Sequence, residues 1–207
     1  MPFRLLALVG LLGTIAISAT YRYRARQTGH VIRRADEPAG LKAGRLVIGL
    51  PLFLSLVIVF ARPQLLSWAG AALPAWLQAV GAGMALATIP AAWWVFRSIG
   101  RNVSETILTK SDHQLVTIGP YRWIRHPLYA TGSLLLLGVG LATANALVLA
   151  LATIAVLAIR LFVVPMEERE LRARFGQAYE DHSRGTGGML PRLGKAPGNH
   201  PSIDVGA

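Results

Sequence analysis

The chain alternates between long apolar runs and short polar connections that are rich in arginine. Five apolar segments can be read from this pattern: roughly Phe3 to Tyr21, Leu46 to Leu66, Pro74 to Phe96, Leu128 to Thr143 and Ala146 to Val164. A helix needs about 20 apolar residues to cross the hydrocarbon core of a bilayer, and the first three segments meet that requirement. The pattern therefore predicts membrane-spanning helices.

The last two apolar segments are shorter and are joined only by residues 143–145, so they are expected to form a tight antiparallel hairpin. Pro165 then breaks the helix or opens a new one. After it, Leu171, Phe175 and Tyr179 recur every four residues between charged positions, which predicts an amphipathic helix. The stretch from Gly185 onward is rich in glycine and proline and is expected to be a disordered tail.

Composition supports this interpretation. Hydrophobic residues make up 53% of the chain and charged residues 15%, whereas about 25% charge is typical of soluble domains. A net charge of +11 would indicate nucleic acid binding in a soluble protein. Here the lysines and arginines lie in the connections between apolar segments, so a lipid bilayer is the expected partner and nucleic acid is not.

The distribution of positive charge predicts the orientation. The connection Arg22 to Arg45 holds seven lysines and arginines, the connection Arg97 to Arg125 holds five, and the chain from Arg160 onward holds seven, while the opposite side has only Arg4 and Arg62. The positive-inside rule then places the N-terminus outside and the C-terminus in the cytoplasm, in the inner or plasma membrane if the source is bacterial. A cleavable signal peptide ending near residue 19 is the alternative for the first segment.

The predicted fold class is thus all-α: a polytopic integral membrane protein with about five transmembrane helices, the last two a tight hairpin, plus a C-terminal cytoplasmic amphipathic helix. Residues 1–96 hold the first three helices, residues 97–183 form a core of loop, hairpin and C-terminal helix, and residues 184–207 are the tail. The chain has no cysteine, and its five histidines show no paired ligand spacing, so no metal site is expected. The pattern does not define an oligomeric state.

Candidate chemistry gathers in GPYRWIRHPLYATG, residues 119–132, immediately before the hairpin. Pro127 is expected to be the first residue of a helix whose free backbone N–H groups favour oxygen ligands. Three interpretations stay open at this point. The stretch, with Tyr121, Trp123 and Tyr129, is an interfacial anchor, a membrane-surface lipid patch, or a reaction site at the edge of the bilayer.

Glu167 and Glu168 follow the other end of the hairpin, so they are expected to lie about 10 Å or less from Arg125 and His126. Carboxylates near lipid are costly and often mark function. A ligand site and a plain Arg–Glu salt bridge that closes the hairpin are both compatible with this placement.

The order of motifs resembles that of the isoprenylcysteine carboxyl methyltransferase family, within a wider group that includes phospholipid N-methyltransferases. The resemblance covers about residues 97–182. It is carried by His113-x-Leu115-Val116, Gly119-Pro120-Tyr121, Arg125-His126-Pro127-x-Tyr129-x-x-Gly132, the hairpin, Glu167-Glu168 and Phe175-Gly176-x-x-Tyr179.

This resemblance implies an S-adenosyl-L-methionine-dependent methyltransferase that acts on a small lipophilic or prenyl-type acceptor carrying a carboxyl, amine or hydroxyl group. A sulfonium cofactor carries an activated methyl group, so the protein's tasks are positioning and charge complementarity. The residues that it assigns to the cofactor are His113, Gln114, Leu115, Val116, Tyr121, Arg125, His126, Pro127, Leu128, Tyr129, Glu167 and Glu168.

One departure bears on the acceptor. The eukaryotic carboxyl methyltransferases carry an arginine for the substrate carboxylate four residues before the matching glutamate, where this chain has Val163. Arg160, one turn earlier, is a candidate replacement, and His126 and Tyr129 are candidates for removing a proton from an amine or hydroxyl acceptor. An NADPH-dependent enzyme similar to sterol reductases and a non-catalytic lipid-binding protein are the alternative functions.

Overall fold

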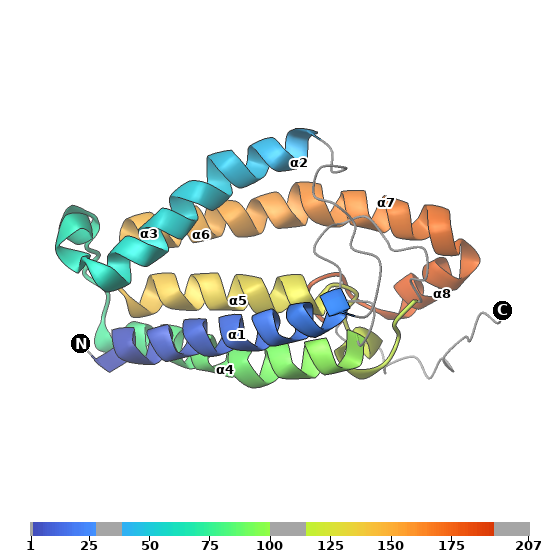
Figure 1. Cartoon of the computed structure of the whole chain (residues 1–207), viewed down its shortest axis with the longest axis horizontal. Helices are drawn as coiled ribbons and strands as arrows, with labels where there is room; N and C mark the ends of the chain where they lie inside the picture. The colour runs from blue at the N-terminus through green and yellow to red at the C-terminus, as the bar shows by residue number, and fades with distance from the viewer. Residues whose placement is uncertain (1, 28–38, 100–114, 193–207) are drawn as a thin grey trace.

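The computed structural model describes residues 2–27, 39–99 and 115–192, which fold into a bundle of helices (Figure 1). No strand occurs within these ranges, apart from two isolated bridges. The elements are α1 (Pro2–Gln27), α2 (Ala39–Gly44), η2 (Arg45–Gly49), α3 (Leu50–Ala61), η3 (Pro63–Ala69), α4 (Ala75–Ile99), η5 (Gly119–Arg122), α5 (Pro127–Ala142), α6 (Ala146–Ala158), η6 (Ile159–Val163), α7 (Val164–Phe175) and α8 (Gln177–Gly185).

Helices α1, α4 and α5 pack most closely, because small residues line their contacts. A Cβ atom on Gly81 of α4 would lie 2.6 Å from the backbone nitrogen of Ala142, and one on Gly138 of α5 would lie 2.8 Å from the carbonyl oxygen of Gly81. The two backbones therefore touch where these helices cross, in the way that small residues allow in membrane proteins. Around the crossing, the buried core consists of Ala7, Val59, Leu66, Ala82, Ala85, Leu135, Val139, Ala142 and Val148.

A hydrogen-bonded threonine pair links α1 to α4 inside this apolar core. The two hydroxyl oxygens of Thr14 and Thr88 lie 2.7 Å apart. Thr88 is fully buried and donates its own proton to the carbonyl oxygen of Ala85 at 2.6 Å, so Thr14 is the donor between the helices. Such a pair satisfies polar groups that would otherwise lose their partners in lipid.

Asn145 organises the end of the molecule where α5 turns into α6. Its side-chain oxygen accepts from the N–H of Val148 at 3.1 Å and so caps α6, while its amide nitrogen donates to the carbonyl oxygen of Leu66 in η3 at 3.0 Å. The backbone N–H of Ala71 adds a bond to the carbonyl oxygen of Ala144 at 2.8 Å. The turn that the sequence places at residues 143–145 is thus tied to the chain between α3 and α4.

The chain from Ala146 to Phe175 is one continuous helical span of 30 residues, which differs from the expectation at Pro165. The helix continues because η6 is a π-helical turn in which the N–H of Val164 reaches back to the carbonyl oxygen of Ile159. The wider turn accommodates the proline ring, whose missing N–H and bulk disturb a regular helix. The predicted amphipathic helix is instead interrupted at Gly176, which has a φ of +50°.

Three of the helices are long and apolar enough to cross a membrane: Pro2–Ala25, Ala75–Ile99 and Ala146–Phe175. The pair Leu46–Ala61 and Pro63–Ala69 would make a fourth span, although it bends by 115°. The fifth apolar segment of the sequence is α5, a shorter helix of 16 residues. The described residues therefore form an all-helical membrane-protein fold with three candidate spans, or four if the bent pair is counted as one span.

The two ends of the bundle differ in charge. Arg4 near the start of α1 and Arg62 at the end of α3 lie at the end that also holds η3. The opposite end holds the C-terminal part of α1, the end of α4, the start of α5, and helices α7 and α8 (Figure 1). The candidate chemistry of the sequence lies at this second end.

Candidate functional site

The start of α5 fixes the centre of the site. His126 immediately precedes the helix with φ −122° and ψ 59°, and Pro127 occupies its first turn, as the sequence predicts. Leu128 packs against the buried cluster of Ala92 and Phe96 near the C-terminal end of α4, as Tyr21 of α1 also does. The site therefore lies at the level where the membrane-spanning helices end.

Arg125 and Glu168 form a direct ion pair between the start of α5 and α7. The guanidinium donates to Glu168 Oε1 through Nε at 2.9 Å and through Nη2 at 2.7 Å. It also donates through Nη1 to the carbonyl oxygens of Thr186 at 2.6 Å and Ser183 at 3.3 Å. The side chains of Arg125 and Glu168 are each only 13% exposed, so this pair is shielded from water and joins three segments of the chain.

His126 lies between two carboxylates. Its Nε2 atom is 3.3 Å from Glu168 Oε1, and its Nδ1 atom is 3.5 Å from Glu167 Oε2. Burial by itself lowers the pKa of His126, but the adjacent carboxylates of Glu167 and Glu168 outweigh burial and raise the pKa above its ordinary value. The ring also stacks on Tyr129 at 5.8 Å between ring centroids. The imidazole is thus favoured in its protonated, cationic form.

Residues 186–188 form a backbone strap along the loop that precedes α5. The N–H groups of Arg125 and His126 donate to the carbonyl oxygens of Gly187 at 2.8 Å and Gly188 at 3.1 Å, and the N–H of Gly187 donates to the carbonyl oxygen of Trp123 at 3.0 Å. Thr186 is 3% exposed. The folded chain therefore extends beyond residue 184, where the sequence analysis began the tail.

Glu167 and Glu168 differ in how many hydrogen bonds their carboxylate oxygens accept. Glu168 accepts from Arg125 through Oε1, and its Oε2 accepts from Arg172 at 3.3 Å. Glu167 Oε2 is buried and makes no hydrogen bond, although it faces His126 Nδ1 at 3.5 Å in an ion pair. Close by, burial and the charge of Glu167 raise the pKa of the half-buried Tyr121 above its ordinary value. Glu167 is therefore the carboxylate with an oxygen still able to accept a hydrogen bond.

The other predicted site residues fall into three groups. Leu115, Val116, Leu128 and Tyr129 are partly buried, and Pro127 is buried, all in the chain that leads into or begins α5. His113 and Gln114 lie outside the described residues. Arg160 is exposed in η6, seven residues and about 10 Å of helix before Glu167, so the structure does not bring it to the other residues.

Two residues at the site were missed by the sequence analysis as site candidates. Arg172 completes the contacts of Glu168 from one turn further along α7, and its i,i+4 spacing was a readable signal. Tyr179 of α8 is 1% exposed, and its hydroxyl makes no hydrogen bond. Burial and the nearby Glu168 raise the pKa of Tyr179 to about 12. Both residues lie around Arg125 and Glu168.

Comparison with known families identifies the region that contains this site. The model of the phospholipid methyltransferase family matches residues 76–178, which include α4, the loop, α5, α6, α7 and the start of α8. Among solved structures, the eukaryotic intramembrane Ras methyltransferase ICMT (isoprenylcysteine carboxyl methyltransferase) superposes with a TM-score of 0.54 and covers 90% of this chain and 67% of its own, at 20% identity. The two therefore share a fold.

Two relatives are known from bacterial metal resistance. The cobalt-zinc-cadmium resistance protein CzcN of Cupriavidus metallidurans is 31% identical over 143 residues, which are 67% of this chain and 62% of the relative. The nickel-cobalt-cadmium resistance protein NccN of Alcaligenes xylosoxydans xylosoxydans is 30% identical over 111 residues, which are 54% of this chain and 47% of the relative. This chain thus spans less than two thirds of each relative, and neither name states a reaction. The family match and the shared fold confirm the resemblance seen in the sequence motifs.

Proposed function

We propose that this chain, whose residues 76–178 match the model of the phospholipid methyltransferase family, is an integral-membrane methyltransferase that uses S-adenosyl-L-methionine. In this proposal it methylates a small lipophilic acceptor at the cytoplasmic face of the membrane. The observation that carries the proposal is the buried cluster of Arg125, His126, Glu167 and Glu168 at the end of the spans, in which Glu167 Oε2 faces His126 at 3.5 Å but makes no hydrogen bond.

The residues present fit such a cofactor. Glu167 Oε2 is buried, faces its ion-pair partner His126 Nδ1 at 3.5 Å and makes no hydrogen bond in the described structure. An ionised carboxylate has lone pairs for more than one donor, and the ribose hydroxyls and the ammonium group of the cofactor are donors. Tyr121 and Tyr129 supply aromatic faces, which favour an adenine ring or a sulfonium cation. In this arrangement Glu167, Tyr121, Leu128 and Tyr129 hold the cofactor, while Glu168 holds Arg125 and His126 in place.

The bound cofactor supplies a methyl group that is already activated for displacement, so no covalent nucleophile is required from the protein. The protein's residues orient the reactants and exclude water. His126 is poorly suited to act as a general base, because both ring nitrogens face carboxylates and its pKa is raised. We infer that His126 acts as a cation within the site, and that an acidic acceptor group ionises without it.

The acceptor is proposed to enter from the bilayer. Leu128 packs against the buried cluster of Ala92 and Phe96 at the end of α4, so the site borders the apolar part of the bundle. A carboxyl, amine or hydroxyl on a lipophilic or prenyl-type molecule would meet a water-soluble cofactor there. Val163 and the exposed Arg160 offer no fixed cation like the arginine expected for a prenylcysteine carboxylate, so the acceptor class is wider than that one group.

Calorimetric titration of the detergent-purified protein with S-adenosylhomocysteine, the product of the methyl donor, tests the cofactor site. We expect saturable binding that Glu167→Gln weakens by about tenfold, which is the effect of losing one charged hydrogen bond. Glu170→Gln is the matched control, since Glu170 lies on the same helix with an exposed side chain. Tyr121→Ala is expected to weaken binding as well.

Absence of binding at about 1 mM ligand would contradict the proposal. So would equal effects of Glu167→Gln and Glu170→Gln. Binding of NADPH in place of S-adenosylhomocysteine would favour a reductase. To identify the acceptor, the protein is incubated with a native lipid extract and cofactor labelled in its methyl group, and the labelled product is identified by mass spectrometry. Binding without transfer to any lipid would favour a non-catalytic lipid-binding protein.

A further inference from the structure

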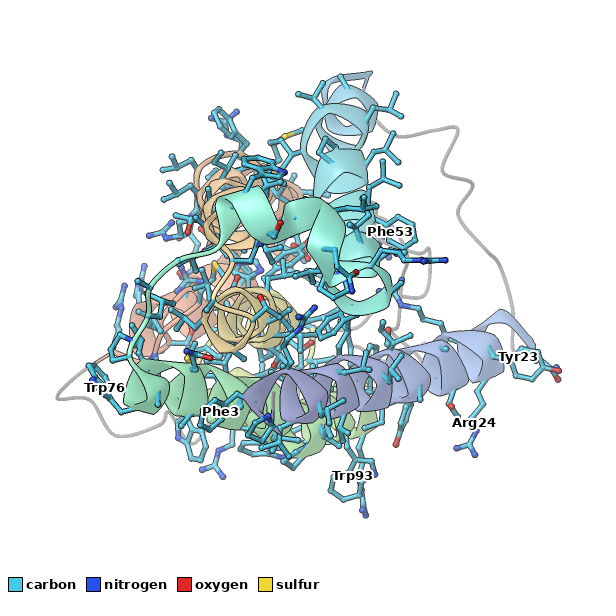
Figure 2. The ribbon with its side chains drawn as sticks, turned by 90° about the vertical axis from the view of Figure 1, so that its left-hand side faces the viewer. Phe3, Tyr23, Arg24, Phe53, Trp76 and Trp93 are labelled. Carbon is cyan, nitrogen blue, oxygen red and sulfur yellow. The ribbon has the colours of Figure 1, made fainter. Side chains whose placement is uncertain are left out.

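Three exposed tryptophans and an arginine gather beside the candidate site. Trp93, Trp94 and Arg97 occupy the last two turns of α4, and Trp123 comes from the loop before α5. Trp93 is 46% exposed, Trp94 is 39% exposed and Trp123 is 44% exposed. Figure 2 shows Trp93 projecting outward from the bundle. These four residues are called the Trp–Arg patch below.

The patch is held together by two ring contacts. The guanidinium of Arg97 lies over the Trp93 ring, 5.1 Å from its centroid. Trp94 meets Trp123 edge to face, with their ring centroids 5.6 Å apart. A guanidinium stacked on an indole keeps its donor edges free for an anion. The patch thus presents a fixed cation within an aromatic surface.

No carboxylate of the described chain neutralises this cation. The ion pairs of the described residues bind Arg125, Arg172 and Arg184 to acidic partners, but none involves Arg97 or the neighbouring Arg122. Both of these arginines have exposed side chains. An arginine that stacks on an aromatic ring without an acidic partner is suited to an external anion.

The position of the patch in the membrane identifies that anion. Helix α4 is a candidate span of 25 residues, so its last two turns lie at the level of the lipid headgroups, where tryptophan is preferred. The anions at that level are the phosphates of phospholipids, and anionic lipids attract arginines there. The occupant that matches both the cation and the indole rings is therefore a phospholipid.

We propose that the Trp–Arg patch binds the headgroup of an anionic phospholipid of the surrounding bilayer. The lipid phosphate accepts hydrogen bonds from Arg97, and the indole rings of Trp93, Trp94 and Trp123 cover the glycerol and upper acyl region. This binding is separate from methyl transfer and does not depend on the proposed reaction.

The patch is also connected to the cofactor site. Trp123 rests on Trp94, and a side chain on Gly119 would collide with Ser98 of α4. The turn η5, which carries Tyr121, is therefore packed directly against the same end of α4 that bears Arg97. A lipid that orders Trp94 and Trp123 would hold η5 in place, so lipid binding is expected to tighten the binding of S-adenosylhomocysteine as a secondary effect.

Native mass spectrometry of the delipidated protein in detergent tests the patch, with phosphatidylglycerol and phosphatidylcholine as the two probes. We expect the wild-type protein to retain phosphatidylglycerol in preference to phosphatidylcholine. Arg97→Gln is expected to weaken phosphatidylglycerol binding by about fivefold, which corresponds to the loss of one basic residue at a membrane surface. Trp93→Ala is expected to weaken the binding of both lipids.

Arg62→Gln is the matched control. Arg62 is also exposed at the end of a helix near an exposed tryptophan, Trp68, but it lies at the opposite end of the bundle. Equal retention of the two lipids by the wild-type protein would overturn the proposal, as would equal effects of Arg97→Gln and Arg62→Gln. Displacement of the lipid by inorganic phosphate would also overturn it, because it would indicate a simple anion site.

Discussion

Adjacent glutamates in α7 carry out different tasks because their surroundings differ. Glu168 receives hydrogen bonds from Arg125 and Arg172 and lies within 3.3 Å of His126. Glu167 Oε2 faces the same histidine at 3.5 Å but makes no hydrogen bond. A carboxylate whose oxygens are fully engaged stabilises the fold, whereas one with an unused buried acceptor is available to a ligand.

Replacing Glu168 is therefore predicted to affect stability more than binding chemistry. Glu168→Gln leaves Arg125 buried without its anion and leaves His126 with Glu167 alone, and breaking a buried ion pair costs about 3–5 kcal/mol. Thermal unfolding in detergent measures the loss. Glu180→Gln is the control, because its ion pair with Arg184 is exposed and 3.9 Å long and is worth at most about 1 kcal/mol. Equal melting temperatures of the two variants would contradict this prediction.

His126 is predicted to make stability depend on pH. Its pKa in the folded protein is raised, so its stabilising contribution is complete below the ordinary pKa of about 6.5 and is lost as the pH rises through the folded pKa. The groups that face it are Glu167, Glu168, Arg125 and Tyr129. The difference in melting temperature between the wild type and His126→Gln should shrink as the pH rises above about 6.5. A difference that grows with pH would contradict the assignment.

At the residue scale, sequence reasoning brought the correct groups near each other but did not distinguish their roles. The short hairpin alone predicts that Arg125 and His126 meet Glu167 and Glu168. Which glutamate oxygen stays free depends on rotamers and on Arg172, and neither follows from spacing along the chain. Arg160 is exposed in η6, about two turns of helix before Glu167, so its role toward the acceptor stays a prediction.

At the scale of elements, the strap of residues 186–188 determines how the site is closed from the C-terminal side. Its carbonyl groups receive the N–H groups of Arg125 and His126, and the guanidinium of Arg125 reaches Thr186. These backbone groups would otherwise be left unpaired where the loop enters α5. The strap therefore orients the two residues that hold the glutamates.

Gly187→Ala is predicted to loosen this strap. A Cβ atom at Gly187 would collide with the carbonyl oxygen of Leu190, whereas one at Gly185 would meet nothing within 4 Å. The expected result is faster hydrogen exchange at the amides of Arg125 and His126 in Gly187→Ala, but not in Gly185→Ala, with a cost of about 1–3 kcal/mol from overpacking. Unchanged exchange at both amides would show that the strap does not restrain the loop.

The structure of residues 185–188 and the continuation of the helix through Pro165 could not be predicted from the sequence, for physical reasons. Glycine-rich segments such as residues 185–188 have the composition of a disordered tail, and only the unpaired N–H groups of a distant loop give them a partner. Pro165 suggested a helix end because a proline disturbs a regular α-helical turn. The π-helical turn before it removes that conflict, and a turn of this kind has no clear signature in one sequence.

At the scale of the whole molecule, the crossing of α4 and α5 connects both ends of the bundle. Helix α5 runs from the site, where His126 precedes it, to Ala142 near the crossing. Helix α4 runs in the opposite direction, from the crossing at Gly81 to the Trp–Arg patch and η5. The distance between α5 and α4 at their crossing therefore affects the position of His126 at the start of α5 relative to Tyr121 in η5, which packs on α4. Small residues at the crossing determine this distance, because only they allow the two backbones to touch.

Gly81→Ala is predicted to increase the distance between α4 and α5 at their crossing. The change would alter the geometry of the site, although Gly81 lies at the opposite end of the bundle. Its Cβ atom would lie 2.6 Å from the backbone nitrogen of Ala142 and 2.7 Å from the carbonyl oxygen of Gly138, so the helices must separate. We expect a loss of about 1–3 kcal/mol in thermal unfolding together with weaker binding of S-adenosylhomocysteine. Gly83→Ala is the control, since a Cβ there meets nothing within 4 Å and alanine favours the helix by about 1 kcal/mol. If Gly81→Ala lowers stability but leaves binding unchanged, the crossing supports the fold without setting the geometry of the site.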